Sequence, residues 1–466
     1  MELALIVTWV VENFQLGDVR RSRALAEMTW GLMRAGVVSF AAIGRAMECG
    51  ATAASCITRV FRFCHNRSVD PRAVQAALVN LLVGRSLHTI GKFTQIATVS
   101  LDWHTYDNGD ISGLRVSLVT GSRALPLLWY EAKRKELKGH LAAMEFEAIA
   151  DLIRFRPPGV TWLILADSWF GRSSELVKLL GDVGYYVARQ PVKMLVHSNL
   201  DCWTKTGNLP VKLGRIVEFG WLHWTVENSC RVRIVAARLY EGKQPRRGRR
   251  SYQHRHDPAY TQPGLCIVAT NLPMEDFSAV GVIRLYARRF EIEHSFRDIK
   301  NATLGMDMEH VHLVETSTYS RLMCIVAVAE ALLWLNGAEA ESRQLHLGLT
   351  PSRPRTGRRV LSLRNVGHLC LGKIPGTTPI NRLLQRHLRA AILAAPDVIG
   401  TTWKDVADRR ELKGLARSPE ELHDLRWTCR RIHKGKGHPR CHDAARWRLS
   451  ASPNACAKRL QKRKAA

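Results

Sequence analysis

The chain has 466 residues, enough for about two to four domains, and its 46% of apolar residues exclude a chain that is disordered throughout. Lys and Arg outnumber Asp and Glu by 69 to 41, and the resulting net charge of +28 favours polyanionic partners, among which charge alone does not choose. No uninterrupted apolar run approaches the roughly 20 residues of a membrane span, and the 11 scattered cysteines favour a reducing cytosol over a disulfide framework.

The first predicted region, residues 1–90, is a compact and basic group of helices. Apolar residues recur at helical spacing in four stretches, and Asp70-Pro71 supplies the cap and first turn of the last one. The predicted helices cover residues 22–33, 37–47, 53–64 and 71–82. Arginines lie among them, including Arg20, Arg21 and Arg23. We predict an N-terminal helical DNA-binding domain with these three as contacts. The alternative is that they are ordinary solvated residues on helix faces.

From about residue 91 the apolar period changes to that of strands. The predicted order is a strand at 96–101, a hairpin of 114–119 and 125–129, a helix at 144–153, a strand at 162–166, a helix at 173–180 and a strand at 185–188. This is the order of elements in an RNase H-like α/β core. Residues 91–190 are therefore predicted to form the first part of such a core.

The remaining chain is predicted to hold an insertion, the rest of the core and a basic end. Residues 191–262 are rich in β-branched and aromatic residues, which indicates a β-rich insertion. The core resumes over residues 263–345, with a strand at 266–270 and one long helix from residue 278 to about residue 300. Residues 346–466 form a basic C-terminal region in which one helix is predicted near 381–393.

Two acidic residues directly follow predicted buried strands. The strand at 96–101 ends at Asp102, and the strand at 162–166 ends at Asp167. In open α/β sheets ligand sites gather just beyond strand ends, so a carboxylate there can reach a bound metal. The alternative is that each Asp starts a turn or caps a helix, and Asp167 does precede a predicted helix.

The long predicted helix adds a third carboxylate. Its spacing puts Tyr286, Arg289, Glu293 and Lys300 within an arc of roughly 60° on one helix face. The alternative is a solvated face on which Arg289 and Glu293 form an ordinary i,i+4 ion pair. Together with the two strand-end aspartates, Glu293 favours a catalytic site.

Three such carboxylates suit hard divalent cations. Mg²⁺ prefers oxygen ligands, and two ions about 4 Å apart can stabilise the attacking and leaving oxygens of an in-line phosphoryl displacement. We therefore predict that Asp102, Asp167 and Glu293 hold two Mg²⁺ ions, for which Mn²⁺ could substitute.

The same residues resemble a known family. The pattern Tyr-x2-Arg-x3-Glu-x6-Lys, met by Tyr286, Arg289, Glu293 and Lys300, is similar to the signature of the insertion-sequence-four family of DDE transposases. Residues 165–171 and the pair Leu101-Asp102 resemble that family's two aspartate motifs, and residues 16–23 and 60–66 resemble its helical DNA-recognition region. The resemblance covers residues from about 10 to 300.

The resemblance implies cut-and-paste transposition. Water would cleave a phosphodiester at a transposon end, and the released 3′-hydroxyl would finally attack target DNA. The family pattern implies that Asp102, Asp167 and Glu293 are the catalytic metal ligands. Tyr286, Arg289 and Lys300 would then hold double-stranded DNA at the terminal inverted repeats.

Further expectations concern the partners and the setting. The resemblance implies a homodimer that joins two transposon ends, and we expect a bacterial cytoplasmic protein, bound to the nucleoid when on DNA, with no membrane association. Two alternatives stay open: an RNase H-like nuclease that cuts without joining, and a catalytically inactive DNA-binding repressor derived from a transposase.

Overall fold

The computed structural model describes residues 2–84, 96–106, 110–121, 123–137, 139–168, 170, 173–197, 203–224, 230–238, 264–301, 305–349, 361–374 and 378–393. The chain divides into two compact units, each made of two chain segments. Unit 1 comprises Met1–Leu163 and Glu291–Ala395, and unit 2 comprises Ile164–Phe290 and Pro396–Ala466. Most of the predicted basic C-terminal region lies outside the described residues.

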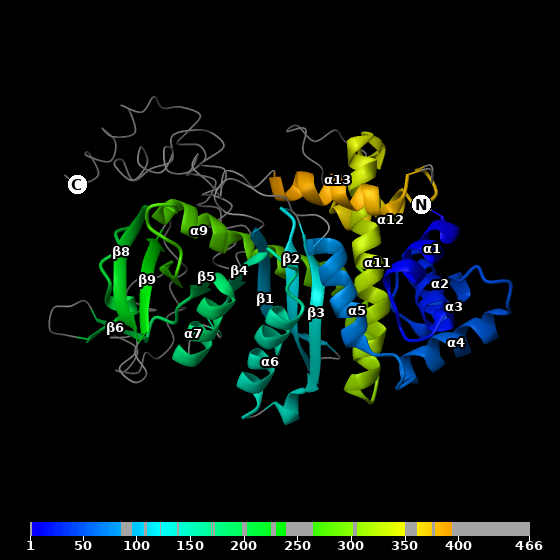
Figure 1. Ribbon diagram of the computed structural model, residues 1–466, viewed down its shortest axis with the longest axis horizontal. Helices are drawn as coiled ribbons and strands as arrows, with labels where there is room; N and C mark the ends of the chain where they lie inside the picture. The colour runs from blue at the N-terminus through cyan, green and yellow to red at the C-terminus, as the bar shows by residue number, and fades with distance from the viewer. Residues whose placement is uncertain are drawn as a thin grey trace, which may run out of the picture. The chain divides into compact units, whose positions relative to one another are not determined.

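Unit 1 begins with a group of helices, coloured blue in Figure 1. They are α1 (Leu3–Asn13), α2 (Val19–Ala35), α3 (Phe40–Ala46), α4 (Ala53–His65) and α5 (Pro71–Val79), followed by a π-helical turn, η1 (Asn80–Gly84). The Asp18 side chain accepts a hydrogen bond from the Arg20 amide at 2.8 Å and begins α2, which Gly36 ends with a left-handed φ of 68°. The four predicted helices are confirmed, and their role in DNA binding stays a prediction.

An antiparallel hairpin and a third strand form the sheet of unit 1. The order is β3 (Ala124–Lys133), β2 (Ile111–Val119) and β1 (Ile96–Tyr106), with β4 (Thr161–Ala166), which is shared between the two units, next to β1. The helix α6 (Leu141–Arg154) packs against β2 and β3. The predicted hairpin is confirmed. The predicted end of the first strand is wrong, because Asp102 pairs with Arg115 and the ladder continues to the pair Tyr106–Ile111.

One long helix that the sequence analysis did not identify, α11 (Thr316–Ser342), forms the core of unit 1. It packs against β3 and against α2, α4 and α5. By its length and a mean hydropathy of 1.5 it could cross a membrane, although Arg321 and Glu330 interrupt its apolar run. The whole of its apolar window is buried inside the protein, and the core helix of a soluble protein passes the same test.

Two glycines let α11 and α12 (Leu363–Leu369) approach each other closely. A Cβ atom on Gly337 would collide with the carbonyl oxygen of Leu363, and one on Gly367 would collide with that of Leu333. The Asn336 side chain also donates a hydrogen bond to the Gly367 carbonyl at 2.7 Å. The crossing therefore rests on backbone-to-backbone contact that a side chain at either glycine would prevent.

A substitution at this crossing should destabilise unit 1. We expect Gly367→Ala to lower the free energy of unfolding by about 2 kcal/mol, because the added methyl group meets backbone atoms that cannot move aside. Gly348→Ala is the matched control, since a Cβ at Gly348 meets nothing within 4 Å. Thermal unfolding of the two variants measures the difference. Equal unfolding temperatures would contradict the close crossing.

The last described helix, α13 (Ile380–Leu393), confirms the helix predicted in the C-terminal region. It is tied to α11 through Glu339, whose carboxylate pairs with Arg386 and accepts a contact from His387 Nε2 at 2.7 Å. The described part of the C-terminal region thus belongs to the packed core of unit 1.

Unit 2 contains the other strands of the chain that the structure describes. Their order, starting from the shared strand, is β4-β5-β10-β9-β8-β6-β7. The strands are β5 (Gly184–Arg189), β6 (Leu195–His197), β7 (Trp203–Lys205), β8 (Arg215–Trp224), β9 (Cys230–Arg238) and β10 (Cys266–Thr270), and the helices include α7 (Ser174–Val183) and α9 (Ala279–Arg288). Because β10 pairs with both β5 and β9, the strands of the predicted insertion extend the sheet. The predicted α/β class is confirmed.

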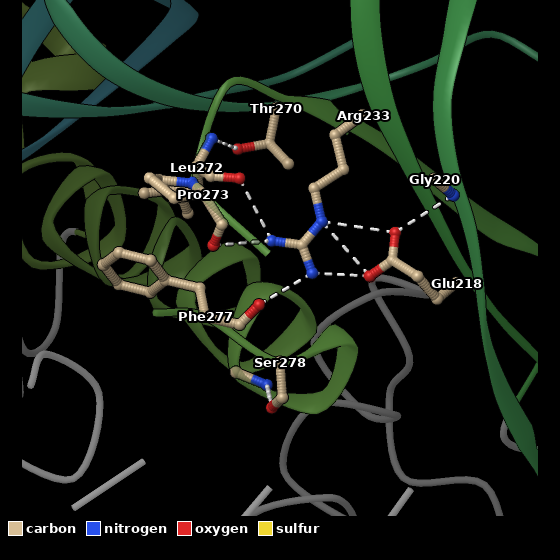
Figure 2. A network of polar contacts seen from close by, with 9 residues as sticks. Glu218, Gly220, Arg233, Thr270, Leu272, Pro273, Phe277 and Ser278 are labelled. Carbon is tan, nitrogen blue, oxygen red and sulfur yellow. Dashed lines mark hydrogen bonds and ion pairs between the residues drawn. The ribbon is translucent and has the colours of Figure 1, made fainter. Parts of the chain in front are cut away.

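A buried arginine fixes the loop that leads into α9. Figure 2 shows Arg233 of β9 between Glu218 of β8 and the loop that precedes α9. Its guanidinium donates to the Glu218 carboxylate at 2.5 Å and to the carbonyl oxygens of Leu272, Pro273 and Phe277 at 3.1, 3.3 and 2.7 Å. Arg233 is only 1% exposed, so these contacts replace its lost hydration. The loop is therefore fixed to the sheet by one side chain.

Candidate active site

Asp102 lies in β1, within unit 1. It is buried, and its Oδ1 accepts a hydrogen bond from the Trp103 amide at 3.0 Å. The Trp103 indole in turn donates to Glu145 of α6 at 2.9 Å, on the opposite face of the strand. Because side chains alternate along a strand, Asp102, His104 and Tyr106 share one face of β1.

The helix α10 (Phe290–Lys300) is docked on the β2–β3 turn by one of its faces. Glu291 accepts hydrogen bonds from the amides of Thr120 and Gly121 at 3.0 and 2.8 Å. One turn further along, the Ser295 hydroxyl bonds to the backbone of Ala124, and Asp298 pairs with Arg123 at 2.8 Å. These three residues at i, i+4 and i+7 fix the rotation of α10 about its axis.

A second face of α10 is turned toward β1. The ring of Phe296 lies 4.5 Å from the ring of His104, between centroids, and the Lys300 ammonium lies 5.5 Å from the centre of the Tyr106 ring. Two residues along the strand correspond to four along the helix, and each step covers about 6–7 Å. The strand and the helix therefore run alongside each other in the same direction.

The contacts His104–Phe296 and Tyr106–Lys300 form a ladder of paired side chains between β1 and α10. Burial is the main influence on the pKa values of its ionisable groups. Burial, with smaller contributions from the positive charges of Arg115 and Lys300, lowers the pKa of His104 well below its ordinary value. Burial also lowers the pKa of Lys300, while the carboxylate of Glu309 at 3.6 Å opposes that shift. The Lys300 ammonium and the uncharged His104 ring thus lie beside the part of β1 that runs between Tyr106 and Asp102.

Unit 2 holds three of the predicted site residues, Asp167, Tyr286 and Arg289. Asp167 directly follows β4, as predicted, and accepts a hydrogen bond from the Ser168 hydroxyl at 3.2 Å. Tyr286 and Arg289 are buried, with the Arg289 guanidinium 5.8 Å from the centre of the Tyr286 ring. Burial raises the pKa of Tyr286 to about 12, against the opposing charges of Arg289 and Arg189.

The predicted single helix from residue 278 to about residue 300 is wrong. The helix α9 ends at Arg288, and α10 begins at Phe290. The Arg289 amide at the junction bonds to the Tyr286 carbonyl at 3.0 Å, three residues back, so the backbone tightens there and the regular α pattern stops. Tyr286 and Arg289 consequently belong to unit 2, and Glu293 and Lys300 belong to unit 1.

The comparison with known families covers this whole region. Residues 91–327, just over half of the chain, match the family model described as the transposase DDE domain. The chain belongs to this family. No curated protein matches the chain. DDE transposases generally depend on divalent metal ions and act on DNA, and this membership supports a transposase rather than an unrelated nucleic-acid-binding protein.

The three carboxylates predicted as metal ligands in this DDE transposase lie in two different units. Asp102 and Glu293 lie in unit 1, and Asp167 lies in unit 2. Within the described ranges, no cluster of three or more His, Cys, Asp or Glu side chains is close enough to hold a metal ion. Their joint role as metal ligands therefore stays a prediction.

The three N-terminal arginines differ in their surroundings. Arg20 and Arg23 are exposed, and Arg23 pairs with Glu27 at 3.1 Å. Arg21 donates to the carbonyl oxygens of Leu16 and Ser68 at 3.0 and 3.3 Å. Arg21 thus also joins two segments of the helical group, and DNA contact by any of the three stays a prediction.

Two residues near the predicted site were missed by sequence reasoning. His104 fills the space between β1 and α10, and Arg189 at the end of β5 lies near Asp167 and Tyr286. Burial would lower the pKa of Arg189, but the neighbouring Tyr286, Cys266 and Asp167 raise it. A basic residue at the end of a predicted strand was the available signal for Arg189, whereas a single His in a strand gave none.

Proposed function

We propose that this DDE transposase cleaves DNA at the ends of a mobile element and joins those ends to target DNA, using Asp102, Asp167 and Glu293 in divalent-metal catalysis. The proposal depends most on one observation, the ladder of paired side chains along β1 and α10. Family membership supports the reaction class, and the ladder supports the choice of carboxylates.

The ladder favours a shared site for Asp102 and Glu293. Tyr106 is paired with Lys300, and His104 with Phe296. Toward the start of both elements, Asp102 lies two residues before His104 on the strand, and Glu293 lies three residues, within one helical turn, before Phe296 on the helix. Glu293 shares a face with Phe296 and Lys300 at i, i+3 and i+7. We therefore infer that the two carboxylates face each other within unit 1.

Carboxylate oxygens fit the metal that the family needs. Mg²⁺ takes oxygen ligands and is usually held by one or two carboxylates together with water and substrate phosphate, and Mn²⁺ could substitute. Bound divalent ions would supply an activated water and stabilise the oxygen that leaves the cleaved phosphodiester. Asp167 is proposed as the third ligand, because it directly follows β4 and matches the family pattern.

The cationic residues are proposed to hold the DNA. Lys300 would bind a backbone phosphate beside the cleaved bond, and Arg289 with Tyr286 would bind the terminal strand, positioning it without reading its sequence. Arg20, Arg21 and Arg23 would add contacts from the N-terminal helices. We further propose that two copies of the chain synapse two terminal inverted repeats as a homodimer.

A cleavage and joining assay tests the proposal. Purified protein is incubated with Mg²⁺, a labelled duplex that carries an inverted repeat from the borders of the coding region, and a supercoiled target plasmid. Cleavage at the repeat followed by joining to the plasmid supports a transposase. Cleavage without joining indicates a nuclease, and binding without cleavage indicates an inactive repressor. Either of the last two outcomes contradicts the proposal.

Removal of the Lys300 charge should weaken binding in a salt-dependent way. We expect Lys300→Ala to make the slope of log K against log salt concentration less negative by about 0.9, the value for one phosphate contact. The change in slope will be somewhat smaller than this value, because Glu309, at 3.6 Å, already neutralises part of the Lys300 charge. Titrations at several salt concentrations measure it, with the exposed Lys373→Ala as control. An unchanged slope argues against a phosphate contact.

A further inference from the structure

Gly113 of β2 lies directly opposite His104 of β1 in the antiparallel ladder. Side chains of directly opposed residues point to the same face, so the His104 ring can lie across the glycine. A Cβ atom at Gly113 would lie 2.5 Å from Nε2 of the His104 ring and would also collide with Cε1. The absence of a side chain at Gly113 is therefore what gives the His104 ring its place.

The same ring is held on its other sides by aromatic residues. The centroid of the His104 ring lies 4.3 Å from that of Tyr106 and 4.5 Å from that of Phe296. His104 is 6% exposed and Phe296 is 8% exposed. Neither ring nitrogen of His104 has a hydrogen-bond partner among the described residues. The ring thus contributes packing between β1 and α10.

We propose that His104, seated over Gly113, is a positioning residue that sets the spacing between Asp102 and Glu293. His104 lies two residues after Asp102 on β1, and its contact Phe296 lies three residues after Glu293 on α10. The ring is therefore the spacer between the strand that carries one carboxylate and the helix that carries the other. This inference rests on the proposed function, because the spacing matters only if the two carboxylates share a site.

The spacer can be displaced without changing either carboxylate. Gly113→Ala pushes the ring toward Phe296 and hence α10 away from β1, because Tyr106 closes the other direction. His104→Ala removes the spacer. The double variant contains the added methyl group but no ring for it to strike. The effect of Gly113→Ala should therefore disappear in the His104→Ala background, which a double-mutant cycle detects.

The readout is metal binding by the full-length protein, measured without DNA cleavage. The unfolding temperature is followed as Mg²⁺ is titrated, and the concentration that gives half of the shift is compared between variants. We expect Gly113→Ala and His104→Ala each to raise it by about tenfold, the size seen when groups that orient metal ligands are lost. The double variant should match His104→Ala alone.

A destabilised control separates positioning from general stability. Leu118→Ala opens a cavity in the same strand, β2, at a buried residue paired with Val99. It should lower the unfolding temperature and leave the half-effect concentration of Mg²⁺ unchanged. An equal rise in Leu118→Ala, or no rise in His104→Ala, overturns the inference.

The titration also distinguishes this inference from the proposed function. If wild-type protein shows no Mg²⁺-dependent shift, the proposed metal site is wrong, and the inference is overturned with it. If wild-type protein shifts and His104→Ala shifts at the same concentration, the inference alone is wrong. Should Gly113→Ala fail to fold, His104→Ala decides the matter, because it removes atoms and introduces no clash.

Discussion

Glu293→Gln should abolish DNA cleavage while leaving DNA binding intact. The substitution keeps the size of the side chain and replaces one carboxylate oxygen by an amide nitrogen, which is not a ligand for Mg²⁺. We expect the cleavage rate to fall by at least about a thousandfold, or roughly 4 kcal/mol in transition-state stabilisation. Because α10 is docked through Glu291, Ser295 and Asp298, its position should not change.

The matched control for this variant is Glu309→Gln. Glu309 is a partly exposed carboxylate that pairs with Lys300, so it shares the surroundings of the site without belonging to the proposed ligands. Its loss should change cleavage by a few-fold at most. Single-turnover cleavage of labelled end DNA, with binding measured separately, compares the two. Cleavage by Glu293→Gln near the wild-type rate would remove Glu293 from the mechanism.

The sequence predicted the local elements around the site well where one strong signal was sufficient. Asp70-Pro71 marks the start of α5, and the strand pattern of residues 114–119 and 125–129 marks the hairpin of β2 and β3, so the structure agrees with those predictions. The same kind of apolar pattern, at residues 96–101, placed the end of the first strand wrongly at Asp102. The run of buried β-forming residues ends at Asp102, but the backbone pairing with β2 continues to the pair Tyr106–Ile111, so the strand extends to Tyr106.

Features that depend on distant parts of the chain could not be predicted in this way. The helix α11 is buried on all sides, so it lacks the apolar stripe by which an amphipathic helix is recognised. The break at Arg289 changes one hydrogen bond and leaves the apolar pattern intact. The contact of His104 with Phe296 joins residues far apart in sequence, and the need for glycine at position 113 follows only from that contact.

The other large effect is expected in unit 2, at the network of Figure 2. Arg233→Met should destabilise the region by about 3–5 kcal/mol, because Glu218 would remain as an uncompensated charge and the carbonyl oxygens of the loop would lose their donor. Hydrogen exchange resolved by segment is the suitable measurement, since a chain of two units need not unfold in one step.

The loss should extend from the sheet to the site through the start of α9. The loop from Leu272 to Phe277 leads directly into α9, which carries Tyr286, so faster exchange over residues 272–288 should accompany weaker binding of end DNA. Arg231→Met is the control, because Arg231 is an exposed arginine on the same strand and its loss should change stability by less than about 0.5 kcal/mol. Faster exchange over residues 272–288 with unchanged binding of end DNA would show that DNA binding does not depend on the position of α9. That result would count against Tyr286 as a DNA contact.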